Sequence, residues 1–281
     1  MIIMSDNIAL CCIGRGENLY AVEFVEWYKK LGFDKIFIYD NNFGDEEHFE
    51  DVLDDYIKDG FVEIMNFRDK VKAQMQAYND CYARHKNEYA WFLYVDFDEF
   101  LVLPQHGSIK DFVKDFPNDC QAILINWLIM TDNNQIHYEP KPLNERFTEV
   151  MDVMKKVQYN FPDDMHVKSL IRGGMDRINF CGNPHTVDTP LIAYTSYGAR
   201  CENRPWQPMN FDKAYLKHFT TKSLQEWIEG KLKKGTADRP YNVFQQTYAD
   251  RYFRINEVTE DKINYLKAIG AILEPSEPQT A

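Results

Sequence analysis

Two aspartates separated by a single residue are the strongest chemical signal in the sequence. Asp96 and Asp98 directly follow the apolar run AWFLYV, residues 90–95, which is predicted to be a buried strand. Since alternate side chains of a strand share a face, the two carboxylates are expected to point the same way. Such a pair can bind Mn²⁺ or Mg²⁺, which can bridge the phosphates of a nucleotide. The alternative is an acidic turn without a metal.

Further polar residues follow other apolar runs of the first half. Asp40 ends the run KIFIYD and can accept hydrogen bonds from a base or a ribose, although a turn aspartate would look the same. Arg15 and Glu17 follow the first apolar run and can meet a nucleotide, or can form a loop salt bridge. Because ligands of parallel sheets bind beyond the carboxyl ends of the strands, these residues are candidate donor-binding groups.

Four residues of the second half are further candidates. His218 can be a third metal ligand beside carboxylates, and Lys222, four residues later, can hold a phosphate. Lys168 brings positive charge into an acidic protein, and it is assigned with His185 to the acceptor side of the site. A lone histidine is more often structural, so these roles depend on whether the chain brings the residues together.

Alternating strand and helix patterns must position these side chains. In the first hundred residues, short β-rich runs alternate with segments that carry apolar residues at helical spacing. This alternation predicts an α/β fold with a mainly parallel sheet and helices on both faces. The predicted strands are 8–13, 35–39, 61–67 and 90–95, and the predicted helices are 18–31, 49–60 and 70–86.

The second half is less regular and contains long polar stretches. Ser223, with Glu226 three positions later, forms a capping box that opens a helix ending at Gly235. Two more helices and a disordered tail from Glu274 are expected to follow. Before them, the sequence predicts a helix over 108–116, strands over 121–127, 166–171 and 191–195, and a long loop over 196–212.

Charge and motif content exclude several function classes. The chain of 281 residues has a formal net charge of -12 and a pI of about 5.1, which disfavours duplex nucleic acid as a partner. It contains no GxSxG, GxGxxG or P-loop motif. No apolar run is long enough to span a membrane and no signal peptide is recognised, so a cytoplasmic protein is expected. The basic stretch Lys231–Lys234 favours a solvated helix face, with peripheral contact to anionic lipid as the alternative.

Five blocks of the sequence resemble one group of enzymes in the same order. The runs GRGENLYAVEFVEWYKKLGFDKIFIYDNN and AWFLYVDFDEFL are similar to the opening and the DxDEF segment of bacterial GT-A glycosyltransferases of the family 2 and family 92 type. HVKSLIR, NPHTV and HFTTKSLQEWIEGKLKKG resemble three later blocks, so the resemblance covers about residues 8–240. The early loop departs from the commoner KNE form, which leaves its nucleotide contacts open.

The resemblance implies a GT-A fold, a nucleotide-sugar donor (usually a UDP-sugar) and a divalent cation. It places Asp96 and Asp98 in the metal and donor-phosphate motif, Asp40 at the nucleotide and His218 in the metal site. The implied acceptor is a glycan, lipid-linked in cell-surface polysaccharide or lipopolysaccharide synthesis at the inner face of the membrane. The implied arrangement is one domain over 1–281, with a nucleotide-sugar-binding half (1–103), an acceptor-side half (104–222), C-terminal helices (223–273) and a tail (274–281).

An inverting transfer also needs a base that deprotonates the acceptor hydroxyl. Asp132, in the loop after the predicted strand 121–127, is the candidate, with Asp163, Asp164 and Glu99 as competitors. Two other functions stay open. A nucleotidyltransferase would use the same carboxylates and metal but would attack phosphorus, and it would need a glycine-rich basic loop. A carbohydrate-binding protein without catalysis would not need the carboxylates.

Overall fold

The computed structural model describes residues 6–152, 163–233 and 246–271. The protein divides into two compact units, each built from two stretches of the chain. The first unit is Met1–Leu128 with Pro162–His218, and the second is Ile129–Phe161 with Phe219–Ala281. The two units therefore interleave along the sequence, whereas the expected subdivision at residues 103 and 222 is sequential.

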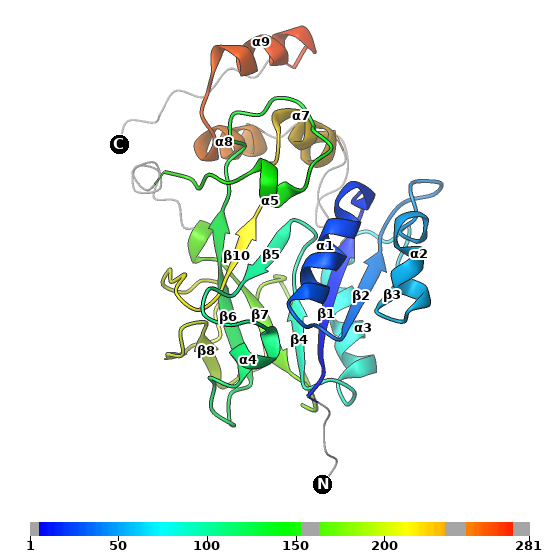
Figure 1. Ribbon diagram of the computed structural model, residues 1–281, viewed down its shortest axis with the longest axis vertical. Helices are drawn as coiled ribbons and strands as arrows, with labels where there is room; N and C mark the ends of the chain where they lie inside the picture. Colours follow the sequence, from blue (N-terminus) through cyan, green and yellow to red (C-terminus); the bar gives the residue numbers. More distant parts are fainter. Residues whose placement is uncertain (1–5, 153–162, 234–245, 272–281) are drawn as a thin grey trace. The chain divides into compact units, whose positions relative to one another are not determined.

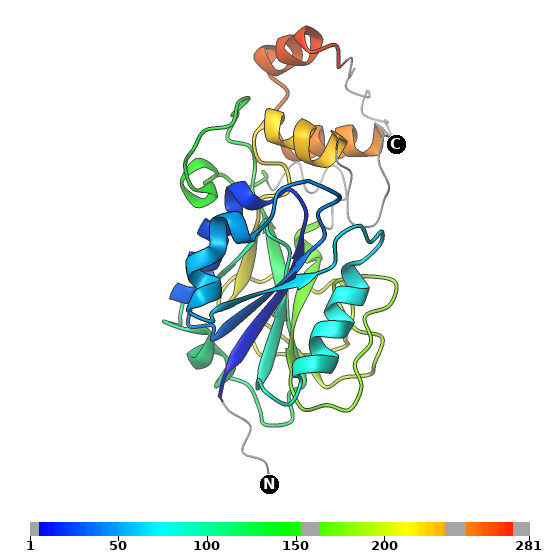
Figure 2. The same ribbon diagram turned by 90° about the vertical axis from the view of Figure 1, so that its right-hand side faces the viewer.

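Four parallel strands with three helices form the first part of the first unit. In chain order these elements are β1 (Ile8–Gly14), α1 (Asn18–Lys30), β2 (Lys35–Asp40), α2 (Glu50–Lys58), β3 (Val62–Asn66), α3 (Gln74–His85) and β4 (Trp91–Tyr94). The strand order β3-β2-β1-β4 is that of Rossmann-like sheets. Figures 1 and 2 show α1 and α2 on one face of these strands and α3 on the other. The predicted α/β architecture, with a mainly parallel sheet flanked by helices, is confirmed.

The helix α1 illustrates how the sequence sets these elements. Its buried side chains include Tyr20, Phe24 and Tyr28, which recur every four residues and so line one face of the helix. The chain leaves the helix through Gly32, whose φ of 85° is in the left-handed region that glycine adopts without a steric penalty. The stop that the sequence predicts at this glycine is therefore confirmed.

Strands with mixed parallel and antiparallel pairing extend the sheet beyond β4. They are β5 (Glu99–Val102), β6 (Ala122–Ile129), β7 (Val167–Arg172), β8 (Ala193–Thr195), β9 (Arg200–Cys201) and β10 (Tyr215–His218), with the short helices α4 (Ile109–Val113) and η1 (Asp163–Met165). β7 pairs antiparallel with both β4 and β6, β8 runs parallel to β6, and β10 pairs antiparallel with β5. The sequence predicts β6, β7 and β8 but misses β5, β9 and β10, and β9 lies within the predicted loop 196–212.

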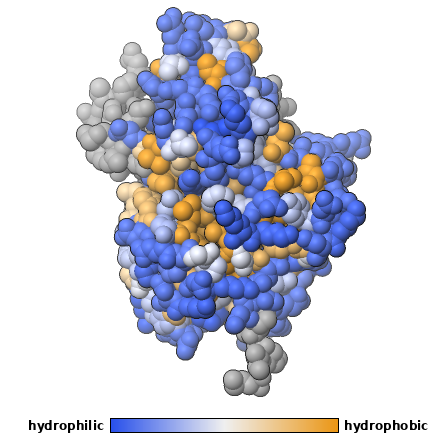
Figure 3. Space-filling model, viewed as in Figure 1, coloured by the Kyte–Doolittle hydropathy of each residue, from blue (hydrophilic) through white to orange (hydrophobic). Residues whose placement is uncertain are grey.

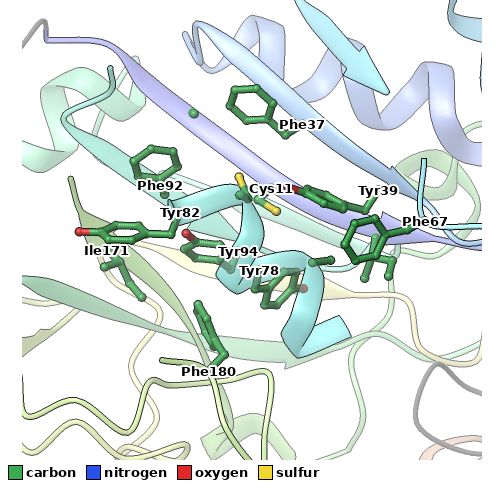
Figure 4. Close-up of a cluster of buried hydrophobic side chains, with 14 of the residues drawn as sticks. Cys11, Phe37, Tyr39, Phe67, Tyr78, Tyr82, Phe92, Tyr94, Ile171 and Phe180 are labelled. Carbon is green, nitrogen blue, oxygen red and sulfur yellow. The ribbon is translucent and has the colours of Figure 1, made fainter. Parts of the chain in front are cut away.

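An aromatic core packs between the sheet and α3, as Figure 4 shows. The ring of Tyr78, on α3, lies 5.0 Å from that of Tyr94 on β4, and Tyr82 lies 5.5 Å from Phe92. Phe180 covers the same cluster at 4.7 Å from Tyr94. Replacing one such buried ring by alanine typically costs about 3–5 kcal/mol, so this cluster holds α3 firmly on the sheet.

The second unit contains short helices around a small core. Its elements are α5 (Leu143–Arg146), α7 (Leu224–Trp227), the π-helix η2 (Ile228–Lys233), α8 (Gln246–Ile255) and α9 (Glu260–Ala268). The predicted capping box is confirmed, because the Ser223 hydroxyl accepts from the backbone of Glu226 and the Glu226 carboxylate accepts from the backbone of Ser223. The predicted helix end at Gly235, part of the basic stretch ending at Lys234, and the tail 274–281 lie outside the described residues.

The surface view in Figure 3 is mostly hydrophilic, with hydrophobic patches between the polar side chains. Leu19 and Val22 on α1 and Val52 on α2 are among the large apolar side chains that are exposed. Within the residues that the structure describes, none of the helices combines the length and the apolar character that a membrane crossing needs.

Candidate active site

The motif Asp96-Phe97-Asp98 lies in the tight connection between β4 and β5 rather than on a strand. β4 ends at Tyr94 and β5 begins at Glu99, so the chain turns between them. The backbone N–H of Asp96 donates to the Glu99 carboxylate at 3.1 Å, and the N–H of Glu99 donates to the Asp96 carbonyl at 3.1 Å. The expectation of two carboxylates on one strand face therefore needs correction, because a turn positions them.

Asp98 and His218 meet although 120 positions separate them in the sequence. β5 and β10 pair so that His218 lies opposite Glu99. His218 Nε2 is 3.6 Å from Asp98 Oδ1, and both side chains are almost fully buried. Asp98, Glu99 and His218 each offer one ligand atom, and these atoms lie within 4.8 Å of one another. The structure thus brings together two of the expected metal ligands, and it adds Glu99.

A buried lysine lies under this motif. Lys168 Nζ is 2.9 Å from Asp96 Oδ2 and 3.5 Å from Glu99 Oε1, and the lysine side chain has no exposed surface. Asp96 Oδ1 accepts from the Gln74 amide at 2.5 Å and from the Tyr78 hydroxyl at 3.1 Å. Both oxygens of Asp96 therefore have partners, and its side chain remains one-third exposed. Lys168 does not reach the surface, which leaves its expected contact with an acceptor without support.

Charges in this cluster are strongly coupled. Burial raises the pKa of Asp96, but Lys168 outweighs it, so the pKa of this carboxyl lies below its usual range. The pKa of Glu99 is raised well above its usual range by burial, against the opposing effect of Lys168. A bound divalent cation would favour the ionised form of Glu99, and three carboxylates with one ammonium then leave two negative charges, which the cation matches.

The donor set fits a divalent metal of intermediate hardness. Carboxylate oxygens suit Mg²⁺ and Mn²⁺, and an imidazole nitrogen beside them favours Mn²⁺ over Ca²⁺. Glu99 Oε1 is buried and has no hydrogen-bond partner among the described residues, and its ion pair with Lys168 is long at 3.5 Å, so the oxygen can also ligate a cation. A second group, Asp40, His48 and Glu50, also lies within ligand distance, but two of its three side chains are exposed. Metal binding at Asp98 and His218 stays a prediction.

Ring side chains surround His218 on the other side. The indole of Trp127 lies 4.2 Å from the His218 ring, 5.3 Å from that of His166 and 5.0 Å from that of His185. The His185 Nδ1 lies 2.9 Å from the Val167 carbonyl, to which it donates. Burial, then Lys168, lowers the pKa of His185 to about 3, so the imidazole is neutral at physiological pH. His185 thus shares the Trp127 ring with His218, and its expected place on the acceptor side stays a prediction.

The loops after β1 and β2 support each other. Arg15 pairs with Glu46 through two hydrogen bonds and lies over the Phe43 ring. Asp40 is buried and pairs with Arg68 at 2.7 Å, and it also accepts two hydrogen bonds from Asn42. Glu17 precedes α1 without capping it. These contacts give Arg15 and Asp40 structural partners, and their expected contacts with a nucleotide stay a prediction.

Two expected site residues belong to the second unit. Lys222 is buried with a φ of 54°, in the left-handed region. Asp132 is buried, its Oδ2 lies 2.6 Å from Lys262 Nζ, and the same oxygen accepts from the Tyr252 hydroxyl. Its other oxygen accepts from the backbone of Asn134 at 2.9 Å. These contacts give the buried Asp132 carboxylate a structural role that requires no catalysis. Its role as the catalytic base stays a prediction.

The known proteins that resemble this chain include plant proteins of glycosyltransferase family 92. A glycosyltransferase family 92 protein of Ricinus communis is 29% identical over 112 residues, which are 40% of this chain and 20% of the relative. One of Oryza sativa subsp. japonica is 23% identical over 110 residues, 39% of this chain and 18% of the relative. The matched segment thus spans about a fifth of each relative. Both are plant proteins, and the bacterial origin that the resemblance implies stays a prediction.

Solved structures give a weaker likeness. The chain is 11% identical to S. aureus TarS 1-349 in complex with UDP-GlcNAc, with a TM-score of 0.43 over 95% of this chain and 82% of that one. For TarS 1-349 in complex with UDP the TM-score is 0.37, at 11% identity, over 59% and 47% of the two chains. The family assignment comes from the sequence. The model of glycosyltransferase family 92 matches residues 8–258, so the chain belongs to this family.

Proposed function

We propose that this protein is a metal-dependent glycosyltransferase that moves a sugar from a nucleotide-sugar, a UDP-sugar, to a glycan acceptor with inversion. One observation carries the proposal: Asp98, Glu99 and His218 present three ligand atoms within 4.8 Å in a chain of glycosyltransferase family 92. Asp98 and Glu99 follow β4, which runs parallel to β1, at the strand ends where such sheets bind ligands, and His218 joins them from the end of β10.

The roles of the residues follow from their exposure and partners. Asp98 and His218 hold the cation, with Glu99 as a third ligand. Asp96, whose carboxylate stays partly exposed, accepts hydrogen bonds from the donor while Lys168 fixes its position. A bound cation supplies charge neutralisation for the departing diphosphate. Because these groups are held in place before the reaction, little reorganisation is needed in the transition state.

The acceptor reaches the site from the side of Trp127 and His185. The acceptor hydroxyl must lose a proton as it attacks, so a base is required. His185 is an acceptor at Nε2 because its Nδ1–H donates to Val167, but its low pKa makes it a weak base. Asp132 remains the candidate base of the sequence, and its test is described below. In the same proposal the acceptor is a lipid-linked glycan of cell-surface polysaccharide or lipopolysaccharide synthesis, met at the inner face of a membrane.

The decisive experiment measures nucleotide binding with and without a metal. Thermal unfolding in Mn²⁺ and in EDTA is used to screen UDP, GDP, dTDP and CMP together with the nucleotide-sugars that contain them. We expect one nucleotide class to stabilise the protein in the Mn²⁺ samples and not in the EDTA samples. The expected stabilisation is about 2.7 kcal/mol when the nucleotide concentration is a hundredfold above its Kd. Asp98→Asn should abolish this stabilisation, and Asp54→Asn, on the exposed face of α2, should keep it. Equal binding in EDTA would overturn the metal assignment.

The released product separates the alternatives. A glycosyltransferase releases a nucleoside diphosphate from its nucleotide-sugar, or CMP from a CMP-sugar. A nucleotidyltransferase joins a nucleoside triphosphate to a sugar phosphate and releases pyrophosphate from the triphosphate. A carbohydrate-binding protein releases neither, and its sugar binding should survive Asp98→Ala. Measuring both products with the nucleotide that binds therefore assigns the class of reaction.

A further inference from the structure

Trp206 is a large aromatic side chain that the fold holds at the surface. It is 53% exposed. The residues on either side are fixed to the beginning of β7: the Val167 N–H donates to the Pro205 carbonyl at 3.0 Å, and the Gln207 N–H donates to the Met165 carbonyl at 2.8 Å. His166 and Trp206 form a β-bridge between them. The exposed indole is therefore presented by anchored backbone and not by a loose loop.

A row of rings leads inward from Trp206. Its ring meets that of His166 edge to face, at 6.0 Å and 76°. His166 stacks on Trp127 at 5.3 Å and 27°, and Trp127 lies 4.2 Å from His218, which is 3.6 Å from the Asp98 carboxylate. All these residues belong to the first unit. The exposed indole and the candidate metal site are thus the two ends of one continuous set of contacts.

The row also contains polar groups that suit a ligand with hydroxyls. Trp127 Nε1 is buried and has no hydrogen-bond partner among the described residues. An unpaired buried donor costs free energy, so an approaching oxygen atom would be stabilised there. His185 lies 5.1 Å from His166, and its Nε2 is an acceptor because its Nδ1–H donates to Val167. One ligand oxygen can therefore accept from Trp127, and one ligand hydroxyl can donate to His185.

Charge narrows the class of ligand. The charged side chains nearest in sequence to Trp206 are Arg204 and Glu202, and they pair with each other. Lys168, closer to Asp98, is buried and bound to Asp96. The row thus offers ring faces and neutral polar atoms. The two cations named here, Arg204 and Lys168, are already paired with carboxylates, so neither is available for an anionic ligand. A pyranose matches this set, because it has an apolar face of C–H groups and a rim of hydroxyls.

We propose that Trp206 is the outer platform of the acceptor subsite and stacks on a neutral pyranose of the glycan, while His166, His185 and Trp127 line the path to Asp98. This inference rests on the proposed function, since it assigns the acceptor side of the same site. It assigns to Trp206 a contribution to acceptor affinity and none to nucleotide binding.

The test uses the full chain with UDP and Mn²⁺ present. Binding of methyl β-galactoside, methyl β-glucoside, methyl α-mannoside and methyl β-N-acetylglucosaminide is measured by saturation-transfer NMR. At least one should bind. Trp206→Ala should weaken that binding about tenfold or more, equivalent to ~1.4 kcal/mol. Trp206→Phe, which keeps a ring, should stay within about threefold of the parent protein. Met209→Ala, at a similarly exposed position, is the matched control and should have no effect.

Measurements on the same samples separate the outcomes. UDP binding and the melting temperature should not change in Trp206→Ala, because the side chain is exposed and lies outside the nucleotide groups. The inference is overturned if Trp206→Ala binds the pyranoside as well as the parent protein does, or if none of the four pyranosides binds the parent. In either case, UDP binding by the parent protein leaves the proposed function intact. Pyranoside binding at Trp206 without UDP binding removes the proposed function and the acceptor assignment together. A change of oligomeric state in Trp206→Ala overturns the inference in favour of an interface between copies.

Discussion

The ammonium group of Lys168 lies 2.9 Å from a carboxylate oxygen of Asp96, and the whole lysine side chain is buried. Burial alone would lower the pKa of Lys168, but Asp96 and Glu99 outweigh it, so the pKa is raised and the charge is retained. A fixed positive charge therefore lies beneath a motif with three carboxyls. It holds Asp96 in one orientation and reduces the repulsion that a metal would otherwise have to overcome alone.

Lys168→Met should destabilise the protein strongly. Removing one partner of a buried ion pair leaves the other charge uncompensated, which typically costs about 3–5 kcal/mol. Lys110→Met is the control, since Lys110 pairs with Asp34 where both side chains are partly exposed and such pairs contribute about 0–1 kcal/mol. Denaturant unfolding of both variants measures the difference. If Lys168→Met lowers the unfolding free energy no more than Lys110→Met does, the buried ion pair contributes no more to stability than the partly exposed one.

His218→Gln should reduce Mn²⁺-dependent UDP binding without unfolding the protein. Glutamine keeps a polar side chain but does not supply the imidazole nitrogen that lies 3.6 Å from Asp98. We expect at least a tenfold rise in the Mn²⁺ concentration needed for half-maximal UDP binding, since losing even an outer partner of a metal ligand typically costs about 10–100-fold in metal affinity. His137→Gln, at an exposed position outside both groups that could hold a metal, should behave as the parent protein. Identical Mn²⁺ titrations for both variants would remove His218 from the metal site.

The sequence predicts the parallel half of the fold well because its signals are local. β1, β2 and β4 are short apolar runs, and a glycine closely follows the end of α1, so each can be recognised from its own residues. β5 and β10 have four residues each and pair across more than a hundred positions. Such strands have no local period to detect, and only long-range pairing creates them. The sequence therefore indicates Asp98 and His218 separately, while their contact needs the structure.

Lys168 shows the same limit for the candidate site. Its neighbours Val167, Leu170 and Ile171 give a strand pattern in which a lysine is expected to face solvent. The structure buries it because Asp96 and Glu99, about 70 residues earlier, supply compensating charge. A sequence signal for this arrangement would be three acidic residues in four positions, which require a nearby cation. The resemblance supplies a metal as that cation and the sequence assigns Lys168 to the acceptor side, whereas the structure places the lysine against the carboxylates.

His185→Asn should flatten the pH dependence of stability in acid. The folded state holds the pKa of His185 near 3, chiefly through burial, whereas an unfolded histidine titrates near ~6.5. Between these values the unfolded state binds more protons, so the unfolding free energy falls as pH drops from about 6.5, by at most about 1.4 kcal/mol per pH unit. Asparagine keeps the donor to Val167 but does not titrate.

The measurement compares the unfolding free energy of the parent protein and His185→Asn at several pH values from 7 to 4, on the order of one pH unit apart. The difference between the two should shrink steadily as the pH falls. His48→Asn, an exposed histidine on the same unit, should follow the parent curve. Parallel curves for His185→Asn and the parent would mean that the imidazole titrates normally in the folded protein.

Asp132→Asn distinguishes a structural carboxylate from a catalytic base. Asp132 lies 2.6 Å from Lys262, both are buried, and Lys262 also donates to the Asn134 side chain and the Glu257 carbonyl. Neutralising Asp132 leaves the buried ammonium of Lys262 without its counter-charge. We therefore expect a loss of about 3–5 kcal/mol in the unfolding free energy, while Asp261→Asn, exposed on α9, should change it by less than about 0.5 kcal/mol.

The double variant Asp132→Asn with Lys262→Met makes the comparison sharper. If the carboxylate serves to compensate the lysine, removing both charges should restore part of the lost stability, since replacing a buried pair with neutral groups is often tolerated. Transfer activity at saturating acceptor should then recover with the fold. A base acts in the transition state, so its loss would reduce turnover without affecting stability or donor affinity. A stable Asp132→Asn protein that binds UDP normally but does not turn over would assign Asp132 as the base and contradict the structural role.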